Sequence, residues 1–255
     1  MKTRIIVAAI GIPLLLLIIF FAPLFVFGCL VGAICACSAY ELLRCVGVRE
    51  KRLTIYSAAW AAAVPVITSL SSAIIIAPLI FLLFAVVFCE LMLSFRRETP
   101  VSFETVTAVL FAGAVMPLLL SALVRLGLRQ HGAVYMLLPF VAAFSSDSGA
   151  YFIGISMGKH RLAPKLSPKK SIEGSVGGFI CAIVAMLIYG LVLQAVGYRV
   201  NLPVLAVYGF LGSLACQLGD LSFSAVKRLY GIKDYGNLLP GHGGALDRFD
   251  SMHFT

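Results

Sequence analysis

A stretch near the end of the sequence concentrates side chains that could bind metal ions and phosphates. Residues 220 to 250 read "DLSFSAVKRLYGIKDYGNLLPGHGGALDRFD", with four aspartates, four Lys or Arg residues, one histidine and five glycines. Neighbouring carboxylates repel one another unless a cation neutralises them, and Mg²⁺ commonly binds one or two carboxylates plus substrate phosphates. Lys and Arg supply the complementary charge for a polyphosphate. The stretch therefore predicts metal-assisted phosphate chemistry.

Glycines surround the single histidine of this stretch. Gly241, Gly243 and Gly244 permit backbone angles and close approaches that larger residues forbid. His242 between them could orient a phosphate or move a proton, and it could equally be a hydrogen-bonded structural residue. The "GHGG" segment lacks the spacing of a P-loop.

A second polar stretch, "GKHRLAPKLSPKKSIEG" at 158–174, carries five Lys or Arg residues. One interpretation is an ordinary basic loop beside a membrane. The other is a phosphate site, because Lys169, Lys170 and Ser171 come directly before an apolar run that predicts a helix. A helix amino terminus offers free N–H groups to an anion.

The elements that must position these residues are membrane helices. The chain is 61% hydrophobic and 12% charged, with a mean hydropathy of +1.02, so a water-soluble globule would lack enough polar surface. Long continuous apolar runs predict helices rather than a barrel. We expect an all-α polytopic transmembrane bundle of about eight spans, at roughly 5–22, 24–43, 55–70, 73–93, 104–124, 133–155, 174–197 and 203–221.

The basic residues orient these spans. Placing the amino terminus and every even-numbered junction on one side gathers 17 of the 20 Lys and Arg residues there, which predicts that side to be cytoplasmic. Both polar stretches then face the cytoplasm of a cell inner membrane. The net charge of +9 gives no reason to invoke nucleic acid, because attraction to anionic lipid explains basic residues in membrane-flanking loops.

Four acids lie inside or at the ends of the expected spans. Glu41 and Glu90 are close in sequence to arginines, which favours ion pairs at the interface, with Arg44 for Glu41 and with Arg96 or Arg97 for Glu90. Asp147 and Asp220 instead lie among serines and glycines, small residues that leave room for a ligand or ion.

The residues from 224 to 250, called the signature segment below, resemble the signature of phosphatidate cytidylyltransferases, also called CDP-diacylglycerol synthases. The match runs from Ser224, Val226, Lys227 and Arg228 through Lys233, Asp234, Gly236, Leu239, Pro240, His242, Gly243 and Gly244 to Asp247, Arg248, Phe249 and Asp250. Ala245 departs from it, because the family has a larger apolar residue there. The stretches "SSDSGAYFIG" and "SPKKSIEGSVGG" also resemble the family's polar segments, so the resemblance covers about 143 to 250.

The resemblance implies that CTP and phosphatidic acid react to give CDP-diacylglycerol and pyrophosphate in phospholipid biosynthesis, with Mg²⁺ as cofactor, a second cation left open, and a homodimer as the assembly. Asp220 and Asp247 are then the leading Mg²⁺ ligands, and Asp250 and Asp147 are further candidates. Catalytic roles fall to Asp220, Asp247, Lys227, Arg228, His242 and Arg248, and substrate-binding roles to Lys169, Lys170, Ser171, Ser224, Lys233, Asp234, Gly243 and Gly244.

The resemblance also divides the chain. We expect amino-terminal transmembrane helices over 1–130 and a catalytic transmembrane region with cytoplasmic loops over 131–255. Family members usually continue past the final Asp-Ser into one more membrane helix, and we expect that helix to be missing here, since the sequence stops at "DSMHFT".

Two alternatives stay open. Another CTP-dependent membrane lipid enzyme, of the polyprenol or phytol kinase type, would share the spans and the charged cytoplasmic site, and its product would be a phosphorylated alcohol. An ion-coupled transporter could also place acids in the membrane, although such proteins tend to show two related halves. The sequence shows no internal repeat.

Overall fold

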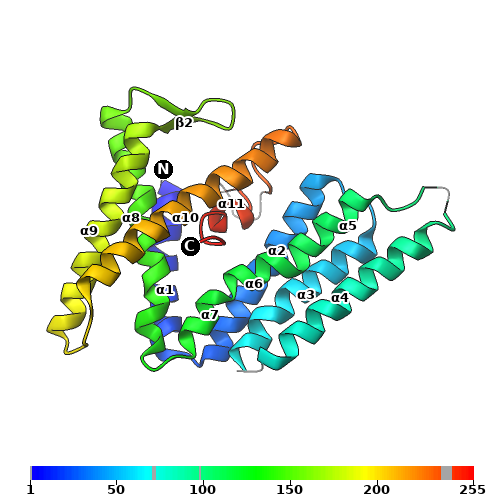
Figure 1. The fold of residues 1–255 in the computed structure, drawn as a ribbon, viewed down its shortest axis with the longest axis horizontal. Coiled ribbons are helices and arrows are strands. Elements are labelled where there is room, and N and C mark those ends of the chain that lie inside the picture. Colours follow the sequence, from blue (N-terminus) through cyan, green and yellow to red (C-terminus); the bar gives the residue numbers. More distant parts are fainter. Residues whose placement is uncertain (1, 71–72, 98, 237–242) are drawn as a thin grey trace. The chain divides into compact units, whose positions relative to one another are not determined.

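The computed structural model describes residues 2–70, 73–97, 99–236 and 243–255. Its described residues form an almost entirely α-helical fold with two short strands, as expected (Figure 1). They divide into two compact units. Residues Met1–Met136 with Ile232–Arg248 make the first, and Leu137–Gly231 with Phe249–Thr255 make the second. The functional division expected at 130/131 stays a prediction.

Helices of the first unit cover the amino-terminal half of the chain. They are α1 (Lys2–Phe21), α2 (Leu24–Val46), α3 (Lys51–Ser69), α4 (Ala73–Ser94), α5 (Phe103–Leu110), the π-helical turn η1 (Phe111–Val115), α6 (Met116–Leu120), α7 (Ala122–Gly127) and the first residues of α8 (Gly132–Met157). The short α11 (Leu246–Phe249) ends the part that returns to this unit.

Elements of the second unit carry most of the polar stretches. They are the rest of α8, strands β1 (Arg161–Ala163) and β2 (Ser167–Ser171), and helices α9 (Ile172–Ala195) and α10 (Leu202–Leu229). The 158–174 stretch, expected as a loop, contains an antiparallel hairpin in which Arg161 pairs with Ser171. The register shifts between Arg161 and Ala163.

The protein is a multi-pass membrane protein. Six helical segments among the described residues are long and apolar enough to cross a membrane, namely α2, most of α4, the continuous run α5–α7, α8, α9 and α10. All eight expected segments occur as helices. Two of them are not among these six. The described apolar stretch of α1 is Ile10–Phe21, and α3 is not among the sufficiently apolar helices.

Small residues allow the helices of the first unit to pack closely. A Cβ atom on Gly32 of α2 would lie 2.6 Å from the Ala62 carbonyl oxygen of α3, and one on Gly28 would lie 2.8 Å from Ser69 Oγ. The Ser57 hydroxyl of α3 donates to the Val109 carbonyl at 3.2 Å, beside the start of η1. Such π-helical turns are usually single insertions within an α-helix, and here the expected 104–124 span is one interrupted helix.

A small apolar cluster and a buried polar row join the helices of the second unit. Leu138 and Ala142 of α8 pack with Met186 of α9 and Leu205 of α10. Ser146 of α8 and Ser213 of α10 share a hydrogen bond of 2.7 Å, and Gln217 Nε2 of α10 donates to the Ser175 carbonyl of α9 at 3.2 Å. Interhelical hydrogen bonds of this kind fix helix register where lipid offers no partner. They fix the position of α10 along its axis relative to the neighbouring helices, and Asp220 lies in the next turn of α10.

Candidate active site

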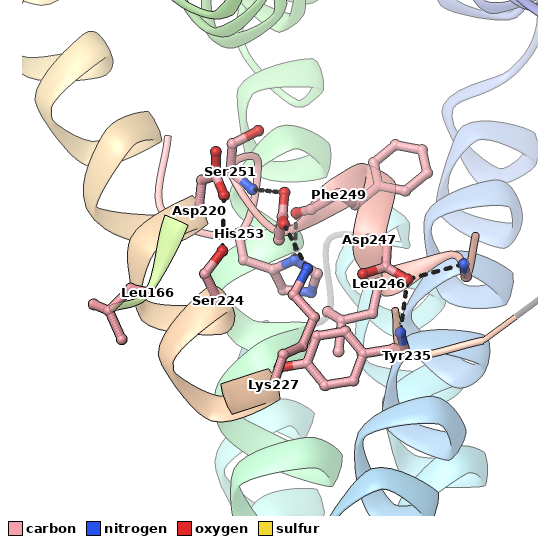
Figure 2. Close-up of polar contacts among 12 residues, drawn as sticks. Leu166, Asp220, Ser224, Lys227, Tyr235, Leu246, Asp247, Phe249, Ser251 and His253 are labelled. Carbon is pink, nitrogen blue, oxygen red and sulfur yellow. Dashed lines mark hydrogen bonds and ion pairs between the residues drawn. The ribbon is translucent and has the colours of Figure 1, made fainter. Parts of the chain in front are cut away.

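Helix α10 presents three polar side chains of the candidate site in successive turns. The helix continues to Leu229, past the end expected near 221. Asp220, Ser224 and Lys227 therefore follow one another at spacings of four and three residues, which places them on one helix face. The Ser224 hydroxyl donates to Asp220 Oδ1 at 3.3 Å (Figure 2).

Each of the two acids near this face meets a lysine. Lys170 Nζ lies 2.5 Å from Asp220 Oδ2, and both side chains are about a third exposed. Lys227 Nζ lies 3.9 Å from Asp250 Oδ2, and both side chains are nearly buried. The second unit thus brings two predicted metal-binding acids together with two predicted phosphate-binding cations.

Asp250 is the most deeply buried of these acids, with 8% of the residue exposed. Its Oδ1 accepts the Ser251 N–H at 2.8 Å. The pKa of Asp250 is raised to about 7, mainly by burial and also by the nearby Asp220, while Lys227 opposes the rise. The raised pKa records first a carboxyl removed from water and second its closeness to another carboxylate.

The third acid of the second unit, Asp147, lies on α8. The Cys216 thiol of α10 faces its Oδ1 at 3.4 Å. Close approach of the 249–255 segment to α10 depends on Gly219, where a Cβ atom would lie 2.9 Å from the Asp250 carbonyl oxygen. Asp147, Asp220 and Asp250 therefore belong to one polar cluster, since both other acids also influence Asp250 electrostatically.

The basic hairpin contributes to the site unevenly. Besides the Lys170 ion pair, the Arg228 Nε donates to the Leu166 carbonyl at 3.2 Å and fastens the hairpin to the end of α10. Lys169 is exposed on β2. Ser171 caps α9, because its buried hydroxyl accepts the Gly174 N–H at 3.1 Å, and its expected role in substrate binding stays a prediction. The lysines do lie beside a helix amino terminus, as the sequence suggested.

The rest of the signature segment belongs to the first unit. Asp247 Oδ2 accepts the N–H groups of Tyr235 at 2.8 Å and Gly244 at 3.0 Å (Figure 2). Gly243 has φ +87°, a conformation that favours glycine. Asp247 thus holds together the two described parts of the segment, a role that its residue type alone did not indicate.

The exposure of the other predicted site residues is as follows. Lys233, Asp234 and Arg248 have exposed side chains, and Gly244 is buried. His242 lies outside the described residues.

Sequence reasoning missed Glu41. This residue of α2 is 6% exposed, and its carboxylate accepts the N–H groups of Ala245 at 3.0 Å and Leu246 at 2.8 Å. The interface pair expected for it, with Arg44, is absent among the described residues, whereas Glu90 pairs with Arg97 at 3.2 Å as expected. A pocket of about 440 Å³ adjoins Glu41, lined by Ala36, Cys37, Tyr40, Glu41, Arg44, Tyr235 and Gly236.

Asp220 and Asp250 supply the hard oxygen ligands that Mg²⁺ takes in proteins. In the described part of the chain, no three His, Cys, Asp or Glu side chains are placed to hold one ion. Mg²⁺ commonly takes only one or two carboxylates and completes its shell with water and substrate phosphates. The mutual repulsion at Asp220 and Asp250 is what such a cation would relieve.

Comparison with known proteins decides the family. The sequence pattern of the Cytidylyltransferase family matches residues 2–255. The chain belongs to this family. The phosphatidate cytidylyltransferase of Bacillus subtilis strain 168 is 43% identical to this chain over 132 residues. The matched region covers 50% of this chain and 46% of that relative's length.

Further relatives give the same result. The phosphatidate cytidylyltransferases of Staphylococcus saprophyticus and Staphylococcus aureus strain COL are each 39% identical over 127 residues, 50% of this chain and 48% of theirs. The chain spans about half the length of the curated relatives it matches. Family membership confirms the resemblance drawn from the signature segment and does not favour a transporter.

Proposed function

We propose that this chain acts as a CTP:phosphatidate cytidylyltransferase, which transfers CMP from CTP to phosphatidic acid and releases pyrophosphate. The observation that carries the proposal is the polar cluster at the end of α10, where Lys170 pairs with Asp220 and Lys227 with Asp250. Relatives named phosphatidate cytidylyltransferase support the choice of reaction. The kinase alternative draws no support from any of these names.

The reaction requires positioning and charge neutralisation more than an activated protein nucleophile. An oxygen of the phosphatidic acid phosphate forms a bond to the α-phosphorus of CTP, and the bond from that phosphorus to the pyrophosphate oxygen breaks. The attacking phosphate is already anionic at neutral pH, so no Ser, Cys or His must lose a proton. The barrier that the protein must lower is repulsion between two anions.

Lysines and arginines of the cluster are suited to that task. Lys170 and Lys227 are held by carboxylates beside α10, and Arg228 adjoins the same hairpin. These cations would bind the phosphates of CTP and the departing pyrophosphate, because charge-assisted contacts to phosphate oxygens are strong in a partly dry site. The exposed Lys169, Lys233 and Arg248 would meet the anionic substrates first.

Mg²⁺ is proposed as the cofactor. Asp220 and Asp250, with Asp147 on α8, would hold it in the second unit. The role of Asp247, which lies in the first unit, stays a prediction from the resemblance. When bound, the ion would supply neutralisation of the CTP phosphates.

We place the protein in the cell inner membrane with the polar cluster on the cytoplasmic side, where CTP is available, and we propose a homodimer. Support for the orientation comes from the uneven distribution of Lys and Arg among the junctions. Support for the dimer comes only from the resemblance.

The test uses the purified protein with CTP, Mg²⁺ and phosphatidic acid in mixed micelles. We expect release of pyrophosphate together with a CMP-bearing lipid, both stopped by EDTA. In a parallel assay with a polyprenol in place of phosphatidic acid, formation of CDP with a phosphorylated polyprenol would indicate a kinase and contradict the proposal. As a matched pair, Lys170→Gln should lower turnover strongly, whereas Arg199→Gln, outside the cluster, should not.

A further inference from the structure

Glu41 is a buried acid that no part of the proposed chemistry uses. It lies near the end of α2, 6% exposed, beside Leu42 and Leu43, which are also buried. A carboxylate removed from water costs several kcal/mol unless it accepts hydrogen bonds or meets a cation. The partners of this carboxylate therefore indicate why α2 carries an acid here.

Both oxygens of Glu41 are bound by backbone groups of the signature segment. Oε1 accepts the Ala245 N–H at 3.0 Å, and Oε2 accepts the Leu246 N–H at 2.8 Å. These donors are 204 and 205 residues away in sequence. Hydrogen bonds to a charged acceptor are stronger and shorter than neutral ones, so the carboxylate fixes the turn that begins α11.

Two glycines of the segment make room for this carboxylate. A Cβ atom on Gly236 would lie 2.6 Å from Glu41 Oε1, and one on Gly244 would collide with Oε2. Both described parts of the segment, before and after residues 237–242, therefore close around one side chain. No larger residue fits at either position unless Glu41 moves.

The same turn carries Asp247. Its Oδ2 accepts the N–H groups of Tyr235 and Gly244, so Asp247 joins the described parts of the segment before and after residues 237–242. Displacement of Ala245 and Leu246 would move Asp247 with them, since they directly precede it in the chain. The placement of an aspartate proposed to bind metal thus depends on an acid in the second helix.

We propose that Glu41 is a positioning residue, which holds the signature segment through the Ala245 and Leu246 amides and thereby sets the position of Asp247. The part concerning turnover rests on the proposed function. The part concerning the segment itself does not.

The decisive variant is Glu41→Gln, which keeps the shape but replaces one acceptor oxygen with an NH₂ group. One backbone N–H then loses its acceptor in a buried place. Hydrogen exchange followed by mass spectrometry should show the amides of Ala245 and Leu246 exchanging at least ~10-fold faster. The matched control is Glu90→Gln on α4, whose partners are Arg97 and Arg52, and this variant should leave exchange in the segment unchanged.

Turnover supplies the second measurement. Glu41→Gln should lower kcat at least ~10-fold with the KM for CTP within about threefold, because a misplaced Asp247 affects the reacting phosphates more than nucleotide capture. Glu41→Asp, which keeps the charge, should recover part of kcat. Thermal melting of each variant normalises turnover to folded protein.

The outcomes separate the two proposals. Unchanged exchange at Ala245 and Leu246 in Glu41→Gln overturns the inference, whatever the activity. Faster exchange with an unchanged kcat per folded molecule overturns the positioning role. A wild-type protein that transfers no CMP defeats the proposed function, while the exchange measurement still decides whether Glu41 holds the segment.

Discussion

Asp250 makes stability depend on pH in a way that can be calculated. The pKa of its buried carboxyl is raised from 3.8 to about 7. A difference of about three pKa units between the folded and unfolded states corresponds to roughly 4 kcal/mol, at about 1.4 kcal/mol per unit. Because the folded pKa is the higher one, the folded state prefers the protonated carboxyl, and the free energy of unfolding falls as pH rises from about 4 to about 7.

The substitution that tests this is Asp250→Asn, which mimics the protonated acid at every pH. In detergent with EDTA present, the wild-type melting temperature should fall between pH 5 and pH 8 relative to that of the variant. This window covers about two of the three pKa units, or roughly 3 kcal/mol, which corresponds to a relative change of about 5–10 °C for a protein of this length. Differential scanning fluorimetry over that range measures it.

Lys227 provides the internal check, because its charge lowers the pKa of Asp250. Lys227→Met should therefore shift the wild-type transition to higher pH. If wild type and Asp250→Asn keep a constant difference in melting temperature from pH 5 to pH 8, the carboxyl is not titrating in that range and the argument from burial fails.

Three further predictions follow from single contacts. Asp247→Asn should leave membrane insertion intact and cut incorporation of radiolabelled CTP into lipid at least ~100-fold, by loss of metal-mediated stabilisation; near-normal incorporation would remove Asp247 from the metal ligands. Lys169→Ala should raise the KM for CTP, seen in initial-rate kinetics, and an unchanged KM would leave this lysine with only a topological role. Gly32→Val should lower the free energy of unfolding by about 2 kcal/mol, because the added Cβ would lie 2.6 Å from the Ala62 carbonyl oxygen; Gly11→Ala, with open space around the new atom, should melt like the wild type.

Composition and hydropathy were sufficient to predict the all-α membrane fold. Continuous apolar runs leave helices as the way to satisfy the backbone within lipid, and all eight expected runs are helical. Segment ends were harder to predict. Helix α10 extends to Leu229 because Ser224 and Lys227 continue its polar face toward Asp220 and Asp250, whereas hydropathy alone ends the span where charges begin.

Residue types predicted which side chains gather in the second unit but not what each one contacts. Lys170 and Asp220 were both expected at the site, and they form an ion pair. Ser171 was expected to bind substrate, which stays a prediction, and the structure adds that its hydroxyl caps α9. A serine before a helix often forms such a cap, but residue type alone does not show which backbone N–H its hydroxyl accepts.

Glu41 and Glu90 show most clearly where sequence reasoning stops. Each is an acid near the end of an apolar helix with arginines within a few residues, so local spacing assigns both to interfacial ion pairs. Glu90 forms that pair with Arg97. Glu41 instead meets a segment some 200 residues later, because Gly236 and Gly244 leave room for a carboxylate and the Ala245 and Leu246 amides need acceptors. The contacts of Glu41 are thus determined by the segment that it meets. A buried backbone N–H without an acceptor costs more free energy than a solvated ion pair with an exposed arginine gains. The carboxylate therefore accepts the two amides.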